Sequence, residues 1–202
     1  MNKTLKRVFD LTLSFSFLGL TFPFLLAIAL AILLDSPGPV LFKGRRVGVD
    51  GREFDILKFR TMVDQAPASS PAITGKKDPR ITRVGRFLRK HKLDEIPQLL
   101  NVLRGEMSLV GPRPEDPKYV RTYTPEQREV LSVRPGIASP AAVKFRHEEA
   151  ILADVPFEDL DGVYLNEILP EKLALDLEYV RRHSIALDIR ILKQAVLSSL
   201  RS

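Results

Sequence analysis

The segment from Leu11 to Leu34 contains no charged residue, and this feature constrains the chain more than any other. A helix needs about 20 predominantly apolar residues to match a hydrocarbon core about 30 Å thick, and the segment reaches that length. It exceeds the apolar region of about 7–15 residues that is usual in a cleavable signal peptide, and no small-x-small cleavage site follows it. We therefore expect residues 1–36 to form a retained membrane helix.

Pro23 lies near the middle of this segment and predicts a bend in the helix at Phe22 and Pro23. Proline removes one helix hydrogen bond and clashes with the preceding turn. Inside a membrane the backbone groups freed at such a bend need local partners, and Thr21 is one candidate.

Basic residues flank the apolar segment on both sides: Lys3, Lys6 and Arg7 before it, and Lys43, Arg45 and Arg46 after it. A simple span usually has asymmetric flanking charge, so this pattern places both ends on the cytoplasmic side. The residues alone leave two arrangements about equally open. One is a helix that re-enters the face it came from, and the other is a kinked helix that spans the bilayer.

Residues 37–202 are predicted to form one continuous domain, because 202 residues with 45% hydrophobic content suffice for one well-buried core. Turn residues at 35–39 end the membrane helix, and short extended pieces around Asp50-Gly51 predict a β-hairpin. The stretch from Asp64 to Asp78 has no hydrophobic period and is predicted to be a loop beside a site. An apolar stripe at Ile96, Leu99, Leu100 and Leu103 and amphipathic stretches over 173–200 predict helices. We expect a mixed α/β fold dominated by helices.

Composition excludes several kinds of chemistry. The absence of cysteine rules out a thiol nucleophile and thiolate metal ligands, and the three histidines lack zinc-site spacing. The formal charge of +6 favours a polyanionic neighbour, which is nucleic acid, an anionic membrane surface or a phosphorylated substrate. No nucleic-acid recognition motif accompanies the arginines, and aromatic residues make up 7% of the chain, so nucleic acid is not expected as a partner.

Arginine recurs every third residue at Arg80, Arg83, Arg86 and Arg89. A helix here would cluster these side chains along one side, which suits phosphate binding. A solvated basic face or a lipid headgroup contact is the commoner role of such a run, and we assign it to the first members of the series. Arg89 lies just upstream of Asp94-Glu95, so we predict that it neutralises phosphate oxygens there.

Asp94-Glu95-Ile96-Pro97 has the pattern of a helix start, with Asp94 as the cap and Pro97 in the first turn. Capping alone would be the favoured interpretation of this pattern. Two adjacent carboxylates among arginines, near a glycine-proline turn, also form a place to hold a divalent ion and a diphosphate together. A carboxylate is also able to act as a nucleophile on phosphorus.

The tetrapeptide Gly111-Pro112-Arg113-Pro114 fixes one arginine between two prolines. The stiff backbone aims the Arg113 side chain with little loss of entropy, which suggests a ligand-binding role. Taken alone the tetrapeptide is a weak signal, and an ordinary Pro-rich surface turn is the alternative. Arg134-Pro135-Gly136-Ile137 is equally ambiguous. The charged run at 144–149 is a candidate sugar contact or a solvated loop.

Together these segments resemble the bacterial sugar transferase family, the monotopic phosphoglycosyl transferases. The resemblance runs in order over nearly the whole chain, through Asp35-Ser36-Pro37-Gly38-Pro39-Val40, Lys58-Phe59-Arg60-Thr61-Met62, Arg80-Ile81-Thr82-Arg83-Val84-Gly85, Leu93-Asp94-Glu95-Ile96-Pro97-Gln98, Gly111-Pro112-Arg113-Pro114 and Arg134-Pro135-Gly136. It implies a re-entrant helix over 1–36 and a compact catalytic core over 37–202 on the cytoplasmic face of the bacterial inner membrane. It also implies a requirement for Mg²⁺.

By this resemblance Asp94 and Glu95 are the catalytic pair, and Asp94 is also a magnesium ligand. Asp94 is implied to attack the β-phosphorus of a UDP-sugar, which releases UMP and forms a covalent phosphosugar-aspartate that undecaprenyl phosphate then attacks. Glu95 is implied to act as a base toward the acceptor or to hold its partner. The residues implied to bind phosphate or nucleotide are Arg89, Pro112, Arg113 and Pro114. The implied partners are the UDP-sugar, undecaprenyl phosphate and the bilayer, with a homodimer as a possible assembly.

Two departures from the family pattern limit what the resemblance implies. Family members often have Ser-Pro at the helix break, where the hydroxyl bonds freed carbonyl groups, whereas Phe22 precedes Pro23 here. The segment 137–143 lacks the Gly-Trp found in galactose- and glucose-type relatives, so the sugar is left open. Two other functions compete with the transferase: a basic membrane adaptor, which gives no purpose to an Asp-Glu pair, and a catalytically silent scaffold.

Overall fold

The structure is a computed structural model that describes residues 2–63, 78–146, 148–152, 155–156 and 158–200. The loop predicted at 64–78 therefore lies outside the described residues except for Asp78. The α-helices are α1 (Lys3–Asp35), α2 (Arg83–Lys90), α3 (Gln98–Arg104), α4 (Pro117–Val120), α5 (Pro140–Lys144), α6 (Glu148–Ile151), α7 (Leu160–Val163), α8 (Leu169–Arg182) and α9 (Ile185–Leu200). The strands are β1 (Leu41–Val47), β2 (Glu53–Phe59), β3 (Ser108–Val110) and β4 (Gly136–Ala138). Short 3₁₀ turns form η1 (Val49–Gly51), η2 (Leu93–Glu95) and η3 (Gln127–Ser132), and η4 (Tyr164–Ile168) is a π-helical turn.

The predicted hairpin is confirmed. β1 and β2 pair antiparallel from Leu41 opposite Phe59 to Val47 opposite Glu53. The connection needs positive φ angles, which Asp50 (55°) and Gly51 (77°) adopt; Asp and Gly tolerate this region better than most residues. A second, parallel pair joins β3 to β4. The mixed fold dominated by helices is also confirmed, and α8 and α9 account for the amphipathic stretches over 173–200.

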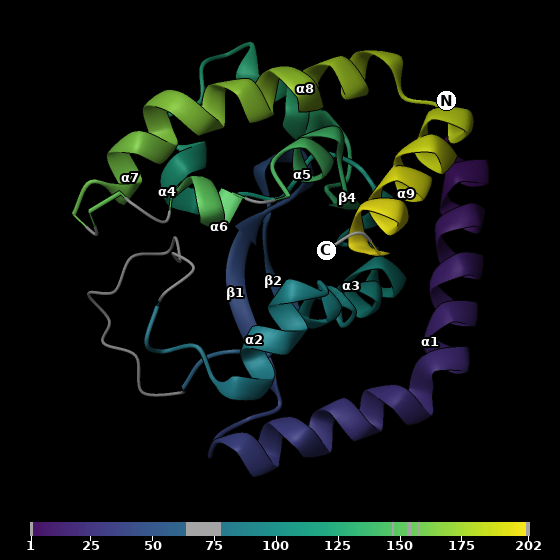
Figure 1. The fold of residues 1–202 in the computed structure, drawn as a ribbon. Helices are drawn as coiled ribbons and strands as arrows, with labels where there is room; N and C mark the ends of the chain where they lie inside the picture. Colours follow the sequence, from purple (N-terminus) through teal and green to yellow (C-terminus); the bar gives the residue numbers. More distant parts are fainter. Residues whose placement is uncertain (1, 64–77, 147, 153–154, 157, 201–202) are drawn as a thin grey trace.

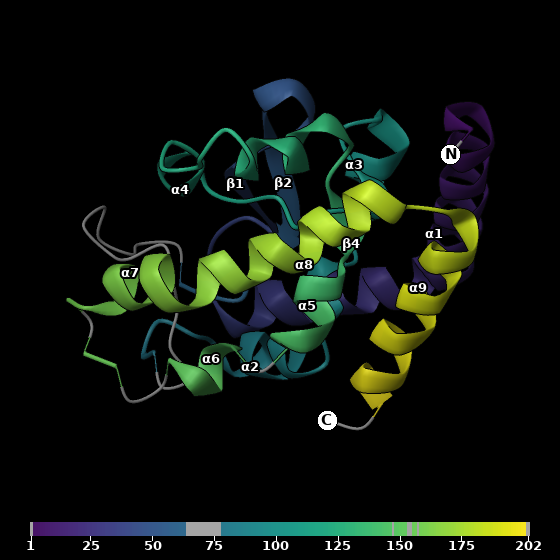
Figure 2. The same cartoon turned by 90° about the horizontal axis from the view of Figure 1, so that it is seen from above.

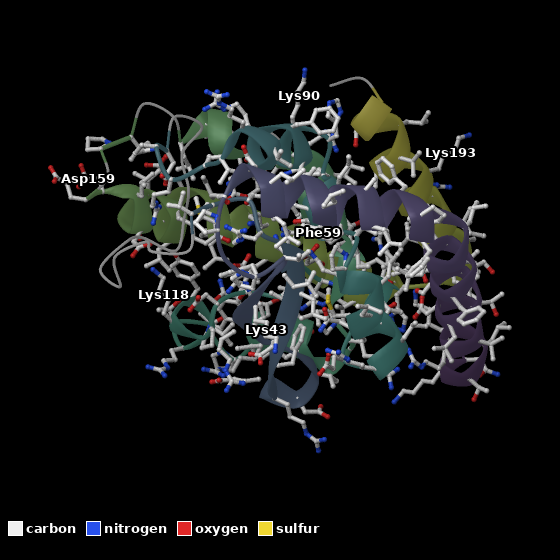
Figure 3. The ribbon with its side chains drawn as sticks, turned by 90° about the horizontal axis from the view of Figure 1, so that it is seen from below. Lys43, Phe59, Lys90, Lys118, Asp159 and Lys193 are labelled. Atoms are coloured by element: carbon white, nitrogen blue, oxygen red, sulfur yellow. The ribbon has the colours of Figure 1, made fainter. Side chains whose placement is uncertain are left out.

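The hairpin lies in the middle of the molecule, with α8 across one side and α2 and α3 on the other (Figure 1). α9 runs beside the first part of α1 in both views (Figures 1 and 2), and the ion pair between Lys6 and Asp188 joins these two helices. Seen from below, Phe59 of β2 lies among the surrounding elements, while Lys90 and Lys193 lie at the outline of the molecule (Figure 3). α3 and α4 pack directly on the hairpin.

α1 is a long apolar helix that changes direction along its length and follows two sides of the molecule (Figure 1). By length and composition it is apolar enough to cross a membrane, and little of its apolar stretch is buried against the rest of the protein. Phe15 and Leu20 are among the large apolar side chains that it exposes. The Thr21 hydroxyl donates to the Phe17 carbonyl oxygen at 2.7 Å. Pro23 cannot donate to the carbonyl of Gly19, and the Thr21 hydroxyl bonds the Phe17 carbonyl rather than that one.

Arg60 holds the turn that ends α1. Its guanidinium donates to the carbonyl oxygens of residues 36 to 39 and to the Ser36 hydroxyl, at 2.6 to 3.3 Å. The Asp35 carboxylate then accepts from the Val84 N–H at 2.9 Å, at the start of α2. Two segments that are far apart in the sequence thus fix the end of α1 against the core.

The buried face of α3 differs from the predicted stripe. Leu99 is buried as expected, but Leu100 and Leu103 are only partly buried, and the polar Gln98 and Asn101 are fully buried instead. Asn101 accepts from the Leu57 N–H at 3.0 Å and donates to the Asp55 carbonyl oxygen at 2.8 Å. It completes the hydrogen bonding of the β2 backbone, which is why a polar residue faces the core here.

Candidate active site

A pocket of about 610 Å³ opens beside the hairpin. β2, η2, the segment that follows Gly111 and helices of the C-terminal half line it. Nine of the lining residues are Lys or Arg and five are Asp or Glu. The excess of positive charge suits an anionic ligand such as a diphosphate. Asp94 and Glu95, the predicted catalytic pair, both lie in this wall.

Glu95 is held by two basic residues from different parts of the chain. Arg113 Nη2 lies 2.6 Å and Lys58 Nζ 2.9 Å from Glu95 Oε1, and Arg113 Nη1 lies 3.4 Å from Oε2. Burial by itself would raise the pKa of Glu95, but the charges of Arg113 and Lys58 outweigh it and hold that pKa well below its usual range. The Glu95 carboxylate in turn raises the pKa of Arg113. Both groups therefore stay ionised.

Asp94 has a different environment from its neighbour. It is 8% exposed, and its Oδ1 atom has no hydrogen-bond partner within the described part of the chain. Burial raises the pKa of Asp94 and the Glu95 charge adds to this rise, against the opposing charges of Lys58, Lys92 and Arg89. A buried carboxylate oxygen without a donor is costly unless a cation or a substrate satisfies it.

The capping interpretation of Asp94 is wrong. η2 places Asp94 in a 3₁₀ turn, and α3 begins at Gln98 after Pro97, without a side-chain cap. Lys92 precedes this turn with a φ of 55°, a left-handed conformation that is uncommon outside glycine. Asp94 therefore lies in η2, ahead of α3, where it is buried in the pocket wall.

Arg113 is positioned through its own backbone. Its N–H donates to Asp176 Oδ2 at 2.9 Å, and the Ala141 N–H donates to Asp176 Oδ1 at 3.4 Å. Burial, opposed by these hydrogen bonds, raises the pKa of Asp176 to about 6. Asp176 on α8 thus joins the loop that contains Arg113 to the start of α5.

Two glycines explain the second ambiguous motif. A Cβ atom on Gly136 would lie 2.0 Å from the Gly111 nitrogen, and one on Gly111 would lie 2.3 Å from the Arg134 carbonyl oxygen. The Gly136 N–H also donates to the Pro112 carbonyl oxygen at 2.8 Å. The segment at 134–136 is therefore the support against which the Arg113 loop packs.

The arginine series divides between pocket and surface. Arg83 to Lys90 form α2 as predicted; Arg83 and Arg86 are exposed, while Arg89 lines the pocket. Arg80 lies before the helix and also lines the pocket, where Asp78 Oδ1 is 2.9 Å from its Nε. The assignment of the first members to a solvated face is therefore wrong for Arg80 and correct for Arg83.

The two prolines around Arg113 do not lie in the same place. Pro114 lines the large pocket, whereas Pro112 lines a small crevice behind the Arg113 loop. From the charged run at 144–149, Phe145, Arg146 and Glu148 line the large pocket, and His147 lies outside the described residues.

Sequence reasoning misses Lys58 and Asp176. Lys58 belongs to one of the motifs that carry the resemblance, yet the sequence predicts no role for it, because a lysine in a strand gives no sign of which helix it faces. Asp176 lies in an amphipathic stretch where an acidic residue is ordinary, and α8 brings it to Arg113 only through tertiary packing. The buried side of α8 also supplies Lys172 to the pocket.

Comparison of the sequence with known proteins shows the family of the chain. A sequence model of the family described as bacterial sugar transferase matches residues 1–202. The chain belongs to the bacterial sugar transferase family. Family membership confirms the resemblance and makes this sugar transferase an enzyme, so the non-catalytic adaptor is not retained.

Three relatives illustrate the relationship. An undecaprenyl-phosphate glucose phosphotransferase of Komagataeibacter xylinus is 41% identical over 93% of the chain, which spans 34% of that protein. A UDP-glucose:undecaprenyl-phosphate glucose-1-phosphate transferase of Caulobacter vibrioides is 39% identical over 96% of the chain and 69% of its own length. The exopolysaccharide production protein PSS of Rhizobium leguminosarum bv. phaseoli is 40% identical over 99% of the chain and 97% of its own length. The sugar transferase thus spans about a third of the first of these relatives and nearly all of the third.

Proposed function

We propose that this protein transfers a sugar 1-phosphate from a UDP-sugar to undecaprenyl phosphate, with Asp94 as the nucleophile. The observation that carries the proposal is the Oδ1 atom of a buried Asp94, which has no hydrogen-bond partner among the residues that the structure describes and lies in a pocket rich in Lys and Arg. The names of the relatives, which include glucose phosphotransferases that act on undecaprenyl phosphate, support the donor and acceptor classes.

The reaction proceeds in two displacements at one phosphorus atom. An Asp94 carboxylate oxygen attacks the β-phosphorus, the bond from that phosphorus to the bridging oxygen breaks, and UMP leaves with the bridging oxygen. An oxygen of undecaprenyl phosphate then attacks the same phosphorus, and the bond to Asp94 breaks. The sugar keeps its own oxygen-phosphorus bond throughout, and the Asp94 carboxylate is regenerated.

Glu95 serves to hold its partners rather than to accept a proton. Its contacts with Arg113 and Lys58 keep its pKa well below the usual range, which makes it a weak base. By pairing with Glu95, Arg113 and Lys58 are fixed where negative charge develops on the phosphoryl oxygens. Arg89 and Arg80 supply further positive charge in the same pocket.

The residues around Asp94 fit a Mg²⁺ ion. Within the described ranges no three Asp, Glu, His or Cys side chains converge to hold a metal by themselves. Mg²⁺ usually binds one or two carboxylates together with substrate phosphates and water, so Asp94 and the donor diphosphate form an adequate set of ligands. A bound Mg²⁺ would offset the charge of the diphosphate and lower the cost of burying the Asp94 carboxylate.

We propose that α1 holds this chemistry at a membrane surface. Its exposed apolar side chains and its change of direction support a re-entrant helix that bends near Phe22 and Pro23 and returns to the cytoplasmic face of the inner membrane. Such a helix lets one pocket meet a water-soluble donor and a lipid-soluble acceptor. Accessibility of single cysteines at Thr4 and Gly38 to an impermeant reagent tests this topology. Labelling of both from the same side supports re-entry, and labelling from opposite sides contradicts it.

The decisive experiment measures UMP release and adduct formation. Detergent-solubilised protein is supplied with Mg²⁺ and a panel of UDP-sugars, first without and then with undecaprenyl phosphate. We expect a phosphosugar adduct on Asp94 without acceptor and sustained UMP release with it, and both are lost in Asp94→Asn and after chelation. Normal turnover by Asp94→Asn would exclude the nucleophile assignment. Folded protein that releases no UMP from any donor would favour the silent scaffold.

A further inference from the structure

One side of the pocket is formed by four residues that the proposed displacement does not use. Tyr164 donates to Glu115 Oε1 at 2.7 Å, and Lys172 Nζ lies 2.9 Å from the Tyr164 hydroxyl. Lys172 also pairs with Glu148 at 3.0 Å and with Glu115 at 3.4 Å. All four line the pocket, and together they are called the Tyr164 cluster.

Lys172 and Tyr164 form the buried part of the cluster. Lys172 is 5% and Tyr164 2% exposed, and the Lys172 ammonium lies 4.8 Å from the centre of the Tyr164 ring. Burial and the charges of Glu115 and Glu148 raise the pKa of Tyr164, so its hydroxyl stays protonated and continues to donate. Tyr164 begins the π-helical turn η4, and such turns occur frequently at functional sites. Hydrogen bonds and ion pairs thus join the four polar side chains to one another.

The cluster lies next to Arg113, on the flank of the reacting centre. Arg113 contacts Glu95 directly, and the charges of Glu115 and Glu148 also raise the pKa of Arg113. Arg113 is therefore the link between the catalytic pair and the Tyr164 cluster. In a UDP-sugar the sugar is bonded to the reacting phosphorus. A sugar on a phosphorus bound next to Arg113 would therefore lie near the Tyr164 cluster.

The chemistry of the cluster suits hydroxyl groups rather than phosphate. Two carboxylates face one ammonium, so the cluster repels anions more than the Arg89 and Lys58 side of the pocket does. A carboxylate has about four lone-pair sites, more than Lys172 and Tyr164 occupy, and each sugar hydroxyl supplies one donor. Tyr119 packs on Tyr164 with ring centres 4.8 Å apart and adds an apolar wall.

We propose that the Tyr164 cluster is the subsite that recognises the sugar of the donor, through hydrogen bonds from hexose hydroxyls to Glu115 and Glu148. This inference rests on the proposed transfer reaction and adds to it the residues that choose among UDP-sugars. Sites that hydrogen-bond a substrate hydroxyl discriminate strongly, because a wrong substrate leaves buried polar groups unpaired. Lys172 and Tyr164 hold the two carboxylates at fixed positions and thereby define which hydroxyl arrangement fits.

The test compares Tyr164→Phe and Glu148→Gln with the wild type, using the full chain in detergent. One arm measures dissociation constants for UDP and for each of several UDP-hexoses and UDP-N-acetylhexosamines. The other arm measures kcat/KM for UMP release with the same donors. We expect the preference between the best donor and its competitors to narrow by about tenfold or more in both variants. The dissociation constant for UDP is expected to change by less than about twofold, because UDP carries no hexose.

Two matched controls keep the result interpretable. Tyr179→Phe removes a buried tyrosine hydroxyl that donates to Asp188, toward the end of α8 that is far from Tyr164, and Glu178→Gln removes an exposed carboxylate paired with Arg182. Both should leave the donor preference unchanged. Equal weakening of UDP and UDP-sugars would assign the cluster to the nucleoside and overturn the proposal, and so would an unchanged donor preference. Wild-type protein that binds UDP-sugars but releases no UMP would instead count against the transfer reaction, while the binding arm still reports on the cluster.

Discussion

The Lys6 ammonium lies 2.8 Å from the Asp188 carboxylate and joins the first part of α1 to the first turn of α9. Lys6 also pairs with Asp10 at 2.9 Å, and Asp10 accepts from the Ser108 hydroxyl at 2.8 Å. Tyr179 donates to Asp188 at 2.7 Å. The beginning of α1 is therefore bound to the core by a buried, charged network, although the helix is otherwise strongly apolar.

Loss of Lys6 should destabilise the protein strongly. Lys6→Met leaves Asp10 and Asp188 buried without their common cation, and breaking a buried pair from one side typically costs about 3–5 kcal/mol. We expect a clear fall in the thermal unfolding midpoint in detergent. The double variant Lys6→Met with Asp188→Asn should recover part of it, because one uncompensated charge is gone. A midpoint equal to that of the wild type in Lys6→Met would contradict the network.

Local sequence patterns predict where the helices and strands of this fold form. They predict less well which of these elements contact one another. Asp50-Gly51 predicts the hairpin because the turn needs positive φ angles, which is a local requirement. The interpretation of Asp94 as a helix cap is wrong because the turn at Lys92, which no sequence pattern predicts, places Asp94 in η2 and not at the start of α3. The pairing of Glu95 with Lys58 depends on how β2 packs against η2, which is a tertiary property.

The same distinction applies to the candidate site. The two prolines beside Arg113 predict a role for it, and the structure brings it to Glu95. Asp176 and Lys172 have no local signal, because each lies in an amphipathic helix where a charged residue is expected on the solvent face. Their burial follows from the way in which α8 covers the pocket.

Replacing Arg113 by lysine should impair catalysis although the charge is kept. A lysine ammonium cannot reproduce the two contacts that the guanidinium makes with Glu95, at 2.6 and 3.4 Å. We expect kcat/KM for UMP release to fall about 10²-fold, the lower range for losing one preorganised electrostatic contact. Arg128→Lys, at an exposed position, is the matched control and should be neutral. Equal activity of the two variants would show that the guanidinium of Arg113 has no role in catalysis.

Asp176 should make stability depend on pH in a defined direction. Its pKa is raised to about 6 in the folded protein, above the value of about 3.9 expected in an unfolded chain. Between these values the folded state binds more protons, so its contribution to stability is present at low pH and is lost as pH rises through about 6. A shift of about two pKa units corresponds to about 3 kcal/mol.

The comparison of wild type with Asp176→Asn isolates this contribution. The difference in unfolding free energy, wild type minus variant, should fall as pH rises from about 4.5 to about 7 and then level off. Asp55→Asn, at an exposed position, is the control and should give no such slope. A difference that is flat across this range would mean that Asp176 titrates normally and does not hold Arg113 from a buried site.

The close approach of two backbone segments makes Gly136 intolerant of any side chain. A methyl group there would lie 2.0 Å from the Gly111 nitrogen and 2.6 Å from the Ala138 carbonyl oxygen, so backbone must move. Because Gly111 leads directly into Pro112 and Arg113, we expect Gly136→Ala to displace the Arg113 loop. UMP release and the thermal unfolding midpoint are measured side by side. UMP release should fall by more than the loss of folded protein explains.

Gly162→Ala is the matched control for this substitution. Apart from its chain neighbours and its own helix backbone, no atom of the described residues lies within 4 Å of the place that a methyl group on Gly162 would take. In a helix such as α7, alanine is favoured over glycine by about 1 kcal/mol. That variant should be as active as the wild type and equally or slightly more stable. Full activity of Gly136→Ala would show that the Arg113 loop does not depend on the contact between Gly111 and Gly136.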